Sequence, residues 1–410
     1  MLRCGLLGEK LGHSYSPRIH SLLGEYAYAL YEKSPGELDD FLKSGAFDGL
    51  NVTIPYKKAV VPYCAELSPA AEHVGSVNTL VRRADGSLYG DNTDYTGFLY
   101  LLDRSGLTVQ GKKCLVLGSG GASLAVAAAL RDRGAETVVI SRSGPDNYEN
   151  LDRHKDARLI VNATPVGMYP AVGKAALDVG AFPDLEGVLD LIYNPARTKI
   201  LLDAERLGLV TGNGLSMLVA QAHRAAELFT GAPIAPAKIE TIWGRLRREM
   251  ENVILVGMPG CGKSTVGRAL AQKLGRTFRD ADRVIAERAG CSIPEIFAKE
   301  GEQGFRTRET EILEELGKQS GLVIATGGGC VTRAENYPLL HQNGTIYFLE
   351  RGLSKLPKEG RPLSQRNDLE AMYEARLPLY RRFADRVIDN DRESPDWAVE
   401  AILRDMEGKT

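Results

Sequence analysis

The chain has 410 residues, of which 43% are hydrophobic and 25% are charged, and its formal net charge is -2. This length exceeds that of a typical single domain and predicts two or three folded units. The balanced charge provides no overall positive field, so we do not expect nucleic acid as a partner.

The first residues and the cysteines indicate the compartment. Met1–Gly8 leads directly into a strand-like run without the longer apolar stretch of a signal peptide, and no later run approaches the roughly 20 apolar residues of a membrane span. The six cysteines are scattered without a CxxC pair, which argues against a structural zinc site and a disulfide framework. We therefore expect a cytoplasmic protein with reduced thiols and no membrane partner.

Apolar runs alternate with helical stretches through most of the chain, for example at 113–117, 137–140, 158–161 and 187–192. This alternation is typical of parallel sheets covered by helices, so we predict an α/β fold. Between about residues 99 and 214 the pattern fits a dinucleotide-binding lobe. Residues 1–98 and 215–249 would form a second lobe.

A glycine-rich turn, Gly118–Ala122 (GSGGA), lies between a strand-like run and a helix. Its glycines allow a tight turn and let a pyrophosphate approach the N–H groups of the helix N-terminus. Because Ser123 occupies the third glycine position, the turn alone also fits a simple strand-to-helix connection. After the next strand, Ser141-Arg142-Ser143 would meet the adenosine ribose. An arginine there can pair with a 2'-phosphate and favours NADP over NAD, although Arg142 could also be a solvated surface residue.

Polar motifs lie at turn-like positions before this region. They are His13–His20 (HSYSPRIH), Asn51–Lys57 (NVTIPYK), Gly75–Thr79 (GSVNT) and Gly90–Asp94 (GDNTD), and a further motif, GLSMLVAQ, spans 214–221. In this order the motifs closely resemble shikimate dehydrogenase over about residues 1–245. The resemblance implies a two-lobe fold with a Rossmann-type NADP lobe, and NADPH-dependent reduction of 3-dehydroshikimate to shikimate.

The same resemblance assigns roles residue by residue. Lys57 and Asp94 would be central to the chemistry. The substrate hydroxyls and carboxylate would be held by Ser14, Ser16, Thr53, Asn78, Tyr193 and Gln221. The cofactor would be held by Gly118, Ser119, Gly120, Gly121, Ala122, Ser141, Arg142, Ser143, Leu191 and Gly214.

Chemistry supports the first two roles. Hydride delivered to a ketone carbon leaves an alkoxide that needs a proton, which an ammonium held by a carboxylate can supply. Without the resemblance, Lys57 would be a surface charge and Asp94 a cap for a helix that begins at Thr96. Tyr95 departs from the family, in which many members carry a small residue after the aspartate, and it leaves the shape of the pocket floor open. The segment 144–155 is too short for a full helix.

An amphipathic helix is predicted at 236–250, and a new strand, Asn252–Val256, follows almost at once. A complete P-loop, Gly257–Ser264 (GMPGCGKS), comes next and opens a helix. The backbone of Gly260, Cys261, Gly262 and Thr265 would help cradle nucleotide phosphates, Lys263 would reach the β and γ oxygens, and Ser264 would ligate Mg²⁺. A glycine turn without nucleotide is the weaker alternative.

Five later motifs follow the P-loop, at 280–282 (DAD), 301–309 (GEQGFRTRE), 325–329 (ATGGG), 360–363 (GRPL) and 376–380 (RLPLY). In that order they resemble shikimate kinase over residues 252–406. The resemblance implies that Asp280 holds Mg²⁺ through water and that Asp282 orients or deprotonates the attacking hydroxyl. Arg306 and Arg376 would grip the shikimate carboxylate, because a guanidinium binds a carboxylate bidentately. Gly328 would approach the substrate ring, and Arg361, on a lid, would stabilise the transferring phosphate.

Together these motifs predict a bifunctional enzyme of chorismate and aromatic amino acid biosynthesis. Its expected parts are a substrate lobe at 1–98 plus 215–249, an NADP lobe at 99–214, and a P-loop kinase domain with a parallel α/β/α sheet at 252–410. Its expected cofactors are NADPH, ATP and Mg²⁺, and its expected partners are 3-dehydroshikimate and shikimate. A domain that binds ligand without chemistry, a first half specific for quinate and NAD, homo-oligomerisation and channelling of shikimate all stay open.

Overall fold

A computed structural model describes residues 1–12, 14–356, 366–392 and 394–408. The chain divides into two compact units, which we describe one at a time. Unit 1 comprises Met1–Met168, Lys174–Tyr193 and Ile200–Arg245. Unit 2 comprises Tyr169–Gly173, Asn194–Lys199 and Leu246–Thr410.

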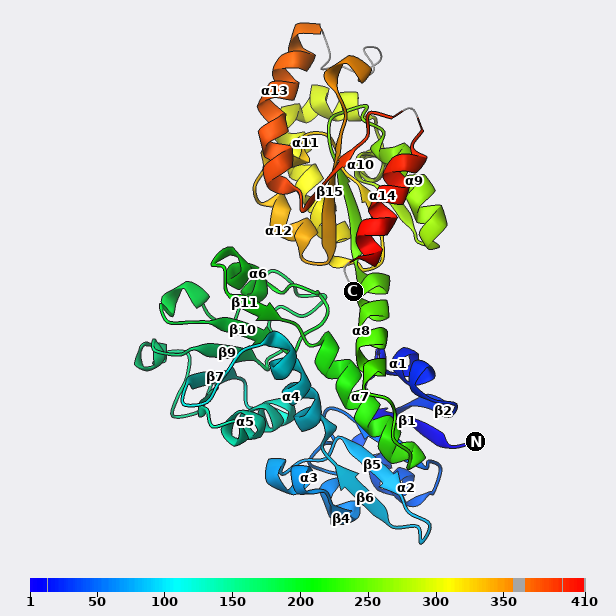
Figure 1. Cartoon of the computed structure of the whole chain (residues 1–410), viewed down its shortest axis with the longest axis vertical. Helices are drawn as coiled ribbons and strands as arrows, with labels where there is room; N and C mark the ends of the chain where they lie inside the picture. Colours follow the sequence, from blue (N-terminus) through cyan, green and yellow to red (C-terminus); the bar gives the residue numbers. More distant parts are fainter. Residues whose placement is uncertain (13, 357–365, 393, 409–410) are drawn as a thin grey trace. The chain divides into compact units, whose positions relative to one another are not determined.

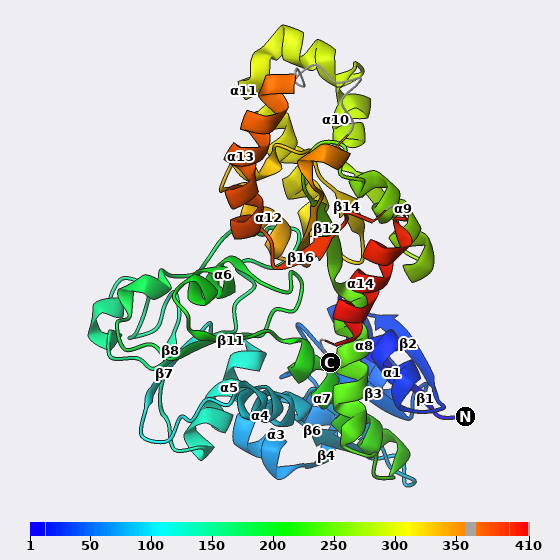
Figure 2. The same ribbon diagram turned by 45° about the horizontal axis from the view of Figure 1, so that its top comes forward.

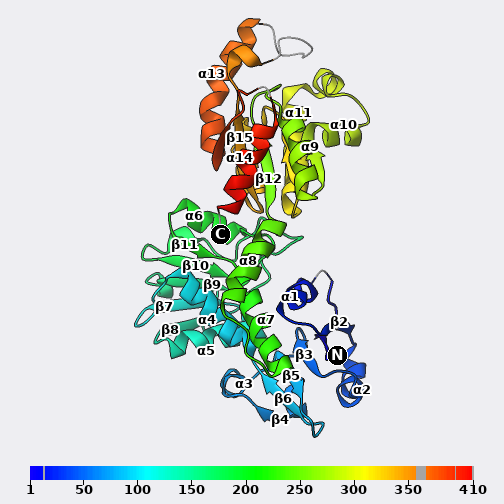
Figure 3. The same cartoon turned by 45° about the vertical axis from the view of Figure 1, so that its right-hand side comes forward.

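The first sheet of unit 1 is mixed and has the strand order β2-β1-β3-β5-β6-β4. Strands β1, β2 and β3 run parallel, β5 is antiparallel to β3 and β6, and β4 is parallel to β6. Helix α1 packs beside β2 (Figure 3). The elements are β1 Arg3–Gly8, α1 Ser16–Leu23, β2 Ala27–Glu32, α2 Leu38–Lys43, β3 Gly49–Val52, β4 Cys64–Leu67, α3 Pro69–Val74, β5 Thr79–Arg82 and β6 Leu88–Asp91.

The second sheet of unit 1 is parallel throughout, in the order β11-β10-β9-β7-β8. It lies between α6 on one side and α4 and α5 on the other (Figure 1). Such a sheet presents the carboxyl ends of its strands along one edge, where ligands bind in this class of fold. The elements are α4 Thr93–Ser105, β7 Lys113–Leu117, α5 Gly121–Asp132, β8 Glu136–Ile140, β9 Leu159–Asn162, β10 Gly187–Asp190, α6 Lys199–Arg206, β11 Val210–Gly212 and α7 Leu215–Thr230.

Helix α8, Ala237–Met250, confirms the predicted amphipathic helix, and β12 begins two residues after its end, at Asn252. In unit 2 the end of this helix is held by Arg276. Its guanidinium donates hydrogen bonds to the carbonyls of Arg248 and Glu251, the second at 2.7 Å. These bonds satisfy carbonyl groups that a helix C-terminus leaves without intrahelical donors.

Unit 2 contains a third, parallel sheet in the order β13-β14-β12-β15-β16. Helices α9 and α14 cover one side, and α12 and α13 the other (Figures 1 and 2). Strand β12 is central and buried along its whole length, which places the P-loop after it at the sheet's carboxyl edge. The elements are β12 Asn252–Val256, α9 Lys263–Leu274, β13 Phe278–Asp280, α10 Ala281–Ala289, α11 Ile293–Lys318, β14 Val323–Ala325, α12 Asn336–His341, β15 Gly344–Glu350, α13 Arg366–Phe383, β16 Arg386–Asp389 and α14 Asp396–Glu407.

Short 3-10 helices complete the description, at Pro35–Glu37, Val61–Tyr63, Leu151–His154, Val179–Ala181, Cys330–Thr332 and Leu353–Lys355. The one at Leu151–His154 agrees with the expectation that 144–155 forms no full helix. The six cysteines are free, and Cys4, Cys114, Cys261 and Cys330 are buried. Within the described ranges, no helix combines the length and apolar character that crossing a membrane requires.

Candidate active sites

Lys57 and Asp94 form an ion pair in unit 1. The Lys57 Nζ donates to the Asp94 Oδ2 at 2.5 Å, and the two side chains are 16% and 5% exposed. Lys57 lies in the turns after β3, and Asp94 lies in the first turn of α4. The alternative capping role for Asp94 is wrong, because α4 begins at Thr93 and Asn92 caps it by accepting a hydrogen bond from the Tyr95 N–H. The carboxylate is therefore available to the lysine.

Asn78 and Gln221 are brought together beside this pair. The Asn78 Oδ1 accepts a hydrogen bond from the Thr93 N–H at 2.7 Å, and its Nδ2 donates to the Gln221 Oε1 at 3.2 Å. Asn78 is thus oriented by α4, while Gln221 comes from α7. Two amide side chains distant in sequence share one polar site.

The remaining substrate candidates are Ser14, Ser16, Thr53 and Tyr193. The Ser14 Oγ accepts from the N–H of Ser16, the first residue of α1, at 3.2 Å. The Thr53 N–H donates to the Leu7 carbonyl at 2.9 Å, which places Thr53 directly after β3 and beside the end of β1. Tyr193 packs edge-on against the Tyr15 ring, and burial raises the pKa of the Tyr193 hydroxyl, which keeps it neutral.

An aromatic layer that had no predicted role consists of His20 of α1 and of Tyr26 and Tyr28. The His20 ring stacks on Tyr28 with ring centres 4.0 Å apart, and its Nδ1 lies 2.6 Å from the Tyr26 hydroxyl. The Tyr28 hydroxyl donates to the Asn51 Oδ1 at 2.7 Å. Burial lowers the pKa of His20 to about 3, so the imidazole is neutral at physiological pH. His20 lies in the motif HSYSPRIH and Asn51 lies in the motif NVTIPYK. Membership of these motifs is the signal that could have identified both residues.

The glycine-rich turn joins β7 to α5 as expected. Gly118 has φ of 105°, and a Cβ there would lie 3.1 Å from the Ala163 carbonyl oxygen. Ser123, which replaces the third glycine, is buried and donates to the Gly120 carbonyl at 2.6 Å. A serine therefore fits this position without an unpaired hydroxyl. Of the other candidates in the turn, Ser119 and Gly120 are exposed, and Gly121 and Ala122 open α5.

The loop after β8 carries the ribose candidates. Its turn is closed by a hydrogen bond from the Ser141 N–H to the Asp146 carbonyl at 3.2 Å. Arg142 and Ser143 are exposed, and the charge of Arg142 opposes the rise that burial causes in the pKa of Tyr148. The exposure of Arg142 is compatible both with a 2'-phosphate ligand and with a solvated surface residue.

Leu191 and Gly214 meet at the end of β10. The Gly214 N–H donates to the Ile192 carbonyl at 3.0 Å, and a Cβ at Gly214 would lie 1.9 Å from the Leu191 carbonyl oxygen. Only glycine permits this approach of the two backbones. Tyr95, which departs from the family pattern, points to α5, where its hydroxyl donates to the Asp132 Oδ2 at 2.7 Å.

The P-loop of unit 2 has the backbone conformation that its glycines predict. Gly257, Gly260 and Gly262 have φ of 149°, 84° and 99°. Lys263 is buried, and its Nζ donates to the carbonyls of Gly257 and Met258 at 2.8 and 3.0 Å. Asn390, which sequence analysis missed, donates its Nδ2 to the Cys261 carbonyl at 2.6 Å and supports the loop from outside the motif.

The two candidate metal ligands are neighbours. The Ser264 hydroxyl, in the first turn of α9, donates to the Asp280 Oδ2 at 2.6 Å. Asp280 also caps α10, its Oδ1 accepting from the Arg283 N–H at 3.4 Å. Hydroxyl and carboxylate oxygens are the donors that Mg²⁺ prefers, so this pair fits that ion. In the described chain, no group of three or more His, Cys, Asp or Glu side chains is arranged to hold a metal ion.

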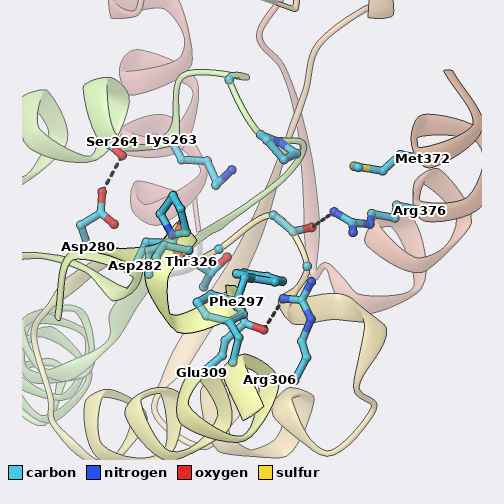
Figure 4. Close-up of a pocket in the computed structure, with 18 of the residues that line it drawn as sticks. Lys263, Ser264, Asp280, Asp282, Phe297, Arg306, Glu309, Thr326, Met372 and Arg376 are labelled. Atoms are coloured by element: carbon cyan, nitrogen blue, oxygen red, sulfur yellow. Dashed lines mark hydrogen bonds and ion pairs between the residues drawn. The ribbon is translucent and has the colours of Figure 1, made fainter. Parts of the chain in front are cut away.

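A pocket of about 760 Å³ lies beside the P-loop, and Lys263, Asp282, Arg306 and Arg376 surround it (Figure 4). The Arg376 Nη1 donates to the Gly328 carbonyl at 3.2 Å, and the Tyr380 hydroxyl donates to the same oxygen. Arg306 and Arg376 lie across the pocket from the acidic Asp282 (Figure 4). Such an arrangement suits an anionic ligand that also carries hydroxyl groups.

Arg306 is held by glutamates that sequence analysis missed. Its Nη1 donates to the Glu309 Oε2 at 2.7 Å, and its Nη2 donates to the Glu302 Oε1 at 3.2 Å. Burial raises the pKa of Glu309, and the charge of Arg306 opposes this rise. A Cβ at Gly329 would lie 2.0 Å from the guanidinium, so the third glycine of the ATGGG motif makes room for Arg306. Arg361 and the motif 360–363 lie outside the described residues.

Two family descriptions match the chain. One, "Shikimate dehydrogenase substrate binding domain", matches residues 6–80, and the other, "Shikimate kinase", matches residues 259–407. A relative from Clostridium perfringens, named shikimate dehydrogenase (NADP(+)), is 34% identical over 265 residues, which cover 59% of this chain and 97% of the relative.

Solved structures agree with the first match. Shikimate dehydrogenase 1 from Peptoclostridium difficile is 38% identical, with a TM-score of 0.56 and coverage of 60% of this chain and 98% of that one. The Thermus thermophilus enzyme, solved with NADP(H) and shikimate, is 36% identical, with a TM-score of 0.55 and coverage of 60% and 99%. A quinate dehydrogenase from Corynebacterium glutamicum, solved with NAD, is 30% identical, with a TM-score of 0.54 and coverage of 58% and 97%.

Proposed function

The chain belongs to the shikimate dehydrogenase family and continues into a shikimate kinase domain, and from this premise we propose that one polypeptide catalyses two consecutive steps of the shikimate pathway. Unit 1 reduces 3-dehydroshikimate to shikimate with NADPH, and unit 2 phosphorylates the shikimate 3-hydroxyl with MgATP. The proposed parts are a substrate lobe at 1–98 plus 215–249, an NADP lobe at 99–214 and a kinase domain at 252–410.

The Lys57–Asp94 ion pair is the observation that carries the first activity. NADPH, when bound, supplies the hydride that reduces the ketone carbon. The Lys57 ammonium donates a proton to the oxygen of the former carbonyl, and Asp94 holds that ammonium in place. Because both side chains are largely buried, their attraction is screened less than that of a surface pair.

The substrate would lie among the hydroxyl and amide groups around this pair. Ser14, Ser16 and Tyr193 would bind its carboxylate, and Thr53, Asn78 and Gln221 would bind its hydroxyls. Support comes from the orientation of Asn78, whose carbonyl oxygen is occupied by the Thr93 N–H and whose Nδ2 faces Gln221. The hydrogen bond from Thr93 holds Asn78 in one orientation, which limits the entropy lost on binding.

The cofactor would follow the glycine-rich turn to the loop after β8. Gly118, Gly120 and the N–H groups that open α5 would receive the pyrophosphate, while Leu191 and Gly214 would border the nicotinamide end. Arg142 would pair with the 2'-phosphate, flanked by Ser141 and Ser143, which favours NADP. A first half that uses quinate and NAD is the second candidate, favoured by the similarity to the quinate dehydrogenase.

Residues of the P-loop would bind ATP in unit 2. Lys263 neutralises charge on the β and γ phosphates, and the backbone from Gly260 to Thr265 donates N–H groups to them. Ser264 and Asp280 would hold Mg²⁺, the aspartate through water; the ion, when bound, neutralises phosphate charge. Their separation of 2.6 Å supports this assignment.

Shikimate would occupy the pocket beside the P-loop. Arg306 and Arg376 would bind its carboxylate, the Gly328 backbone would lie against its ring, and Asp282 would orient or deprotonate the 3-hydroxyl. Arg361 would add positive charge at the transferring phosphate. The pocket volume of about 760 Å³ is ample for a small polar acid beside nucleotide phosphates.

The test is a coupled reaction. The purified chain is incubated with 3-dehydroshikimate, NADPH and MgATP, and NADPH absorbance is followed while mass spectrometry tracks shikimate and shikimate 3-phosphate. Loss of NADPH with formation of the phosphate ester is expected. Accumulation of shikimate without the phosphate ester would indicate that unit 2 binds ligand without catalysing phosphoryl transfer. Turnover of quinate with NAD at a higher kcat/KM would favour a first half that uses quinate and NAD.

A further inference from the structure

A buried carboxylate at the end of β10 has no part in the roles assigned so far. Asp190 is 0% exposed, and its Oδ1 accepts hydrogen bonds from the Asn162 Nδ2 and the Ile192 N–H, both at 3.0 Å. Asn162 ends the neighbouring strand β9 and is also buried. Burial of a carboxylate is costly unless its hydrogen bonds are made, so the two bonds hold both strand ends in one arrangement.

The contacts continue from Asn162 into the loop that follows β9. The Asn162 Oδ1 accepts from the Thr164 hydroxyl at 2.7 Å and from the Thr164 N–H at 3.1 Å. The Thr164 hydroxyl in turn accepts from the Val166 N–H at 3.2 Å. The loop is thereby closed on itself and tied through Asn162 to Asp190.

This loop lies against the glycine-rich turn. A Cβ at Gly118 would lie 3.1 Å from both the Ala163 carbonyl oxygen and the Thr164 Cγ2, so the two backbones touch where the pyrophosphate is proposed to bind. On the other side of Asp190, the Ile192 carbonyl accepts a hydrogen bond from the Gly214 N–H at 3.0 Å. The Leu191 N–H donates to the Asn162 carbonyl, also at 3.0 Å. One carboxylate therefore joins Gly118, Leu191 and Gly214, which lie far apart in sequence.

We propose that Asp190 is the positioning residue of the dinucleotide site, acting through Asn162 and Thr164 on the glycine-rich turn and through Ile192 on Leu191 and Gly214. The proposal rests on the proposed function of unit 1. Asp190 touches no ligand; it sets the separation between the two edges that a dinucleotide must span. Loss of the Asp190 carboxylate weakens cofactor binding more than substrate binding, because the parts that it aligns are proposed to bind the cofactor. These parts are the glycine-rich turn, Leu191 and Gly214.

The test compares Asp190→Ala, Asp190→Asn and Thr164→Val with the full-length protein, and Asp178→Ala, an exposed aspartate in unit 1, is the matched control. We expect Asp190→Ala to raise the KM and the Kd for NADPH about tenfold, a free-energy change of about 1.4 kcal/mol, and to change the KM for 3-dehydroshikimate less than about twofold. Asp190→Asn should restore near-normal values, because the asparagine oxygen still accepts both bonds. Thr164→Val should raise the KM and the Kd for NADPH by a smaller factor. This variant keeps the proposal testable if Asp190→Ala does not fold.

A merely structural role predicts a different result. Misfolding lowers kcat with the fraction of active protein and leaves both KM values unchanged, and that outcome in Asp190→Ala and Thr164→Val would overturn the proposal. The Kd for NADPH is measured from its fluorescence without turnover. If the wild-type chain binds NADPH but reduces nothing, the proposed function fails while the Kd comparison still decides the role of Asp190. If it binds no NADPH, both fail.

Discussion

Lys57 and Asp94 stand 37 positions apart in the chain, yet their charged atoms lie 2.5 Å apart. The pair forms because the turns after β3 and the start of α4 meet at the same end of the first sheet. Sequence reasoning anticipated the partnership from family motifs, and the geometry supplies its distance and its burial. The two proposed chemistries thus depend on single residues, Lys57 in unit 1 and Lys263 in unit 2, whose effects can be separated.

Replacement of Lys57 by alanine should lower the rate of NADPH-dependent reduction by about 10²- to 10⁴-fold, the usual contribution of a general acid. Kinase activity should remain within about twofold of the wild type, because Lys57 belongs to the other unit. Absorbance at the NADPH band measures the first rate, and formation of shikimate 3-phosphate from added shikimate measures the second. Lys58→Ala, at the exposed neighbouring residue, is the control. Equal loss in both variants would contradict the assignment.

The reverse pattern is expected for Lys263→Ala. Phosphoryl transfer should fall by at least about a hundredfold, because the ammonium that stabilises charge on the transferring phosphate is removed. Reduction should be unaffected. Lys273→Ala is the matched control on the same helix, since Lys273 is exposed and pairs with Glu400. Kinase activity that survived in Lys263→Ala would sink the proposed phosphate-binding role.

At the scale of elements, helix α1 packs on β2 through an aromatic layer. The His20 ring lies between Tyr28, stacked at 4.0 Å, and Phe229 of α7, at 5.8 Å. A neutral imidazole fits this apolar environment, and an imidazolium does not. The placement of Ser16, which opens the helix, therefore depends on the protonation state of a residue in its next turn.

The dehydrogenase half should lose stability in mild acid. The pKa of His20 falls from 6.5 to about 3 on folding. Since the folded pKa is depressed, protons bind the unfolded chain first, and stability that is complete above pH 6.5 declines as the pH falls towards 3. At pH 5 the loss from this group is about 2 kcal/mol relative to pH 7. Denaturant unfolding of the wild type and of His20→Phe measures it, with His73→Phe, at an exposed histidine, as control. An identical pH dependence in all three proteins would refute the explanation.

The whole molecule consists of two compact units with separate sheets and separate cores. Helix α8 leads from one to the other, and its end is fixed within unit 2 by Arg276. This organisation favours two active sites that work on their own ligands. Channelling of shikimate remains a hypothesis that rests on the short junction, and equal dilution of a labelled intermediate by free shikimate in the fused and the separated domains would reject it.

Two thermal transitions are expected in calorimetry, one for each unit. A ligand stabilises only the fold that binds it, by about 2.7 kcal/mol at a concentration of 100 times its Kd. NADPH should therefore raise the midpoint of one transition, and MgATP that of the other. If only one transition is seen and each ligand shifts it, the two units unfold together. If two transitions are seen and both ligands shift the same one, the separate assignments are contradicted.

Much of the local structure could be predicted because it depends on neighbouring residues. The strands at 113–117 and 252–256, the helix at 236–250 and the left-handed glycines of the P-loop all follow from periodicity or from the conformational freedom of glycine. The start of α4 was misplaced by three residues, because the capping role of Asn92 was not recognised. No role was predicted for Asn390 and Asp190, since each contacts a segment that is distant in sequence. Glu309 lies inside a predicted motif and only three residues from Arg306, but its role depends on the burial of both side chains.

By itself the sequence determined the α/β class, the two phosphate-binding turns and the two family resemblances, because short motifs carry those signals within a few residues. Only the tertiary structure decided how deeply the Lys57–Asp94 pair is buried, that Asn390 supports the P-loop and that Asp190 joins the strand ends at the dinucleotide site. Isolated in the sequence, an aspartate or glutamate is typical of a solvated surface. Its role appears only when the fold removes it from water and brings hydrogen-bond donors or a cation to it.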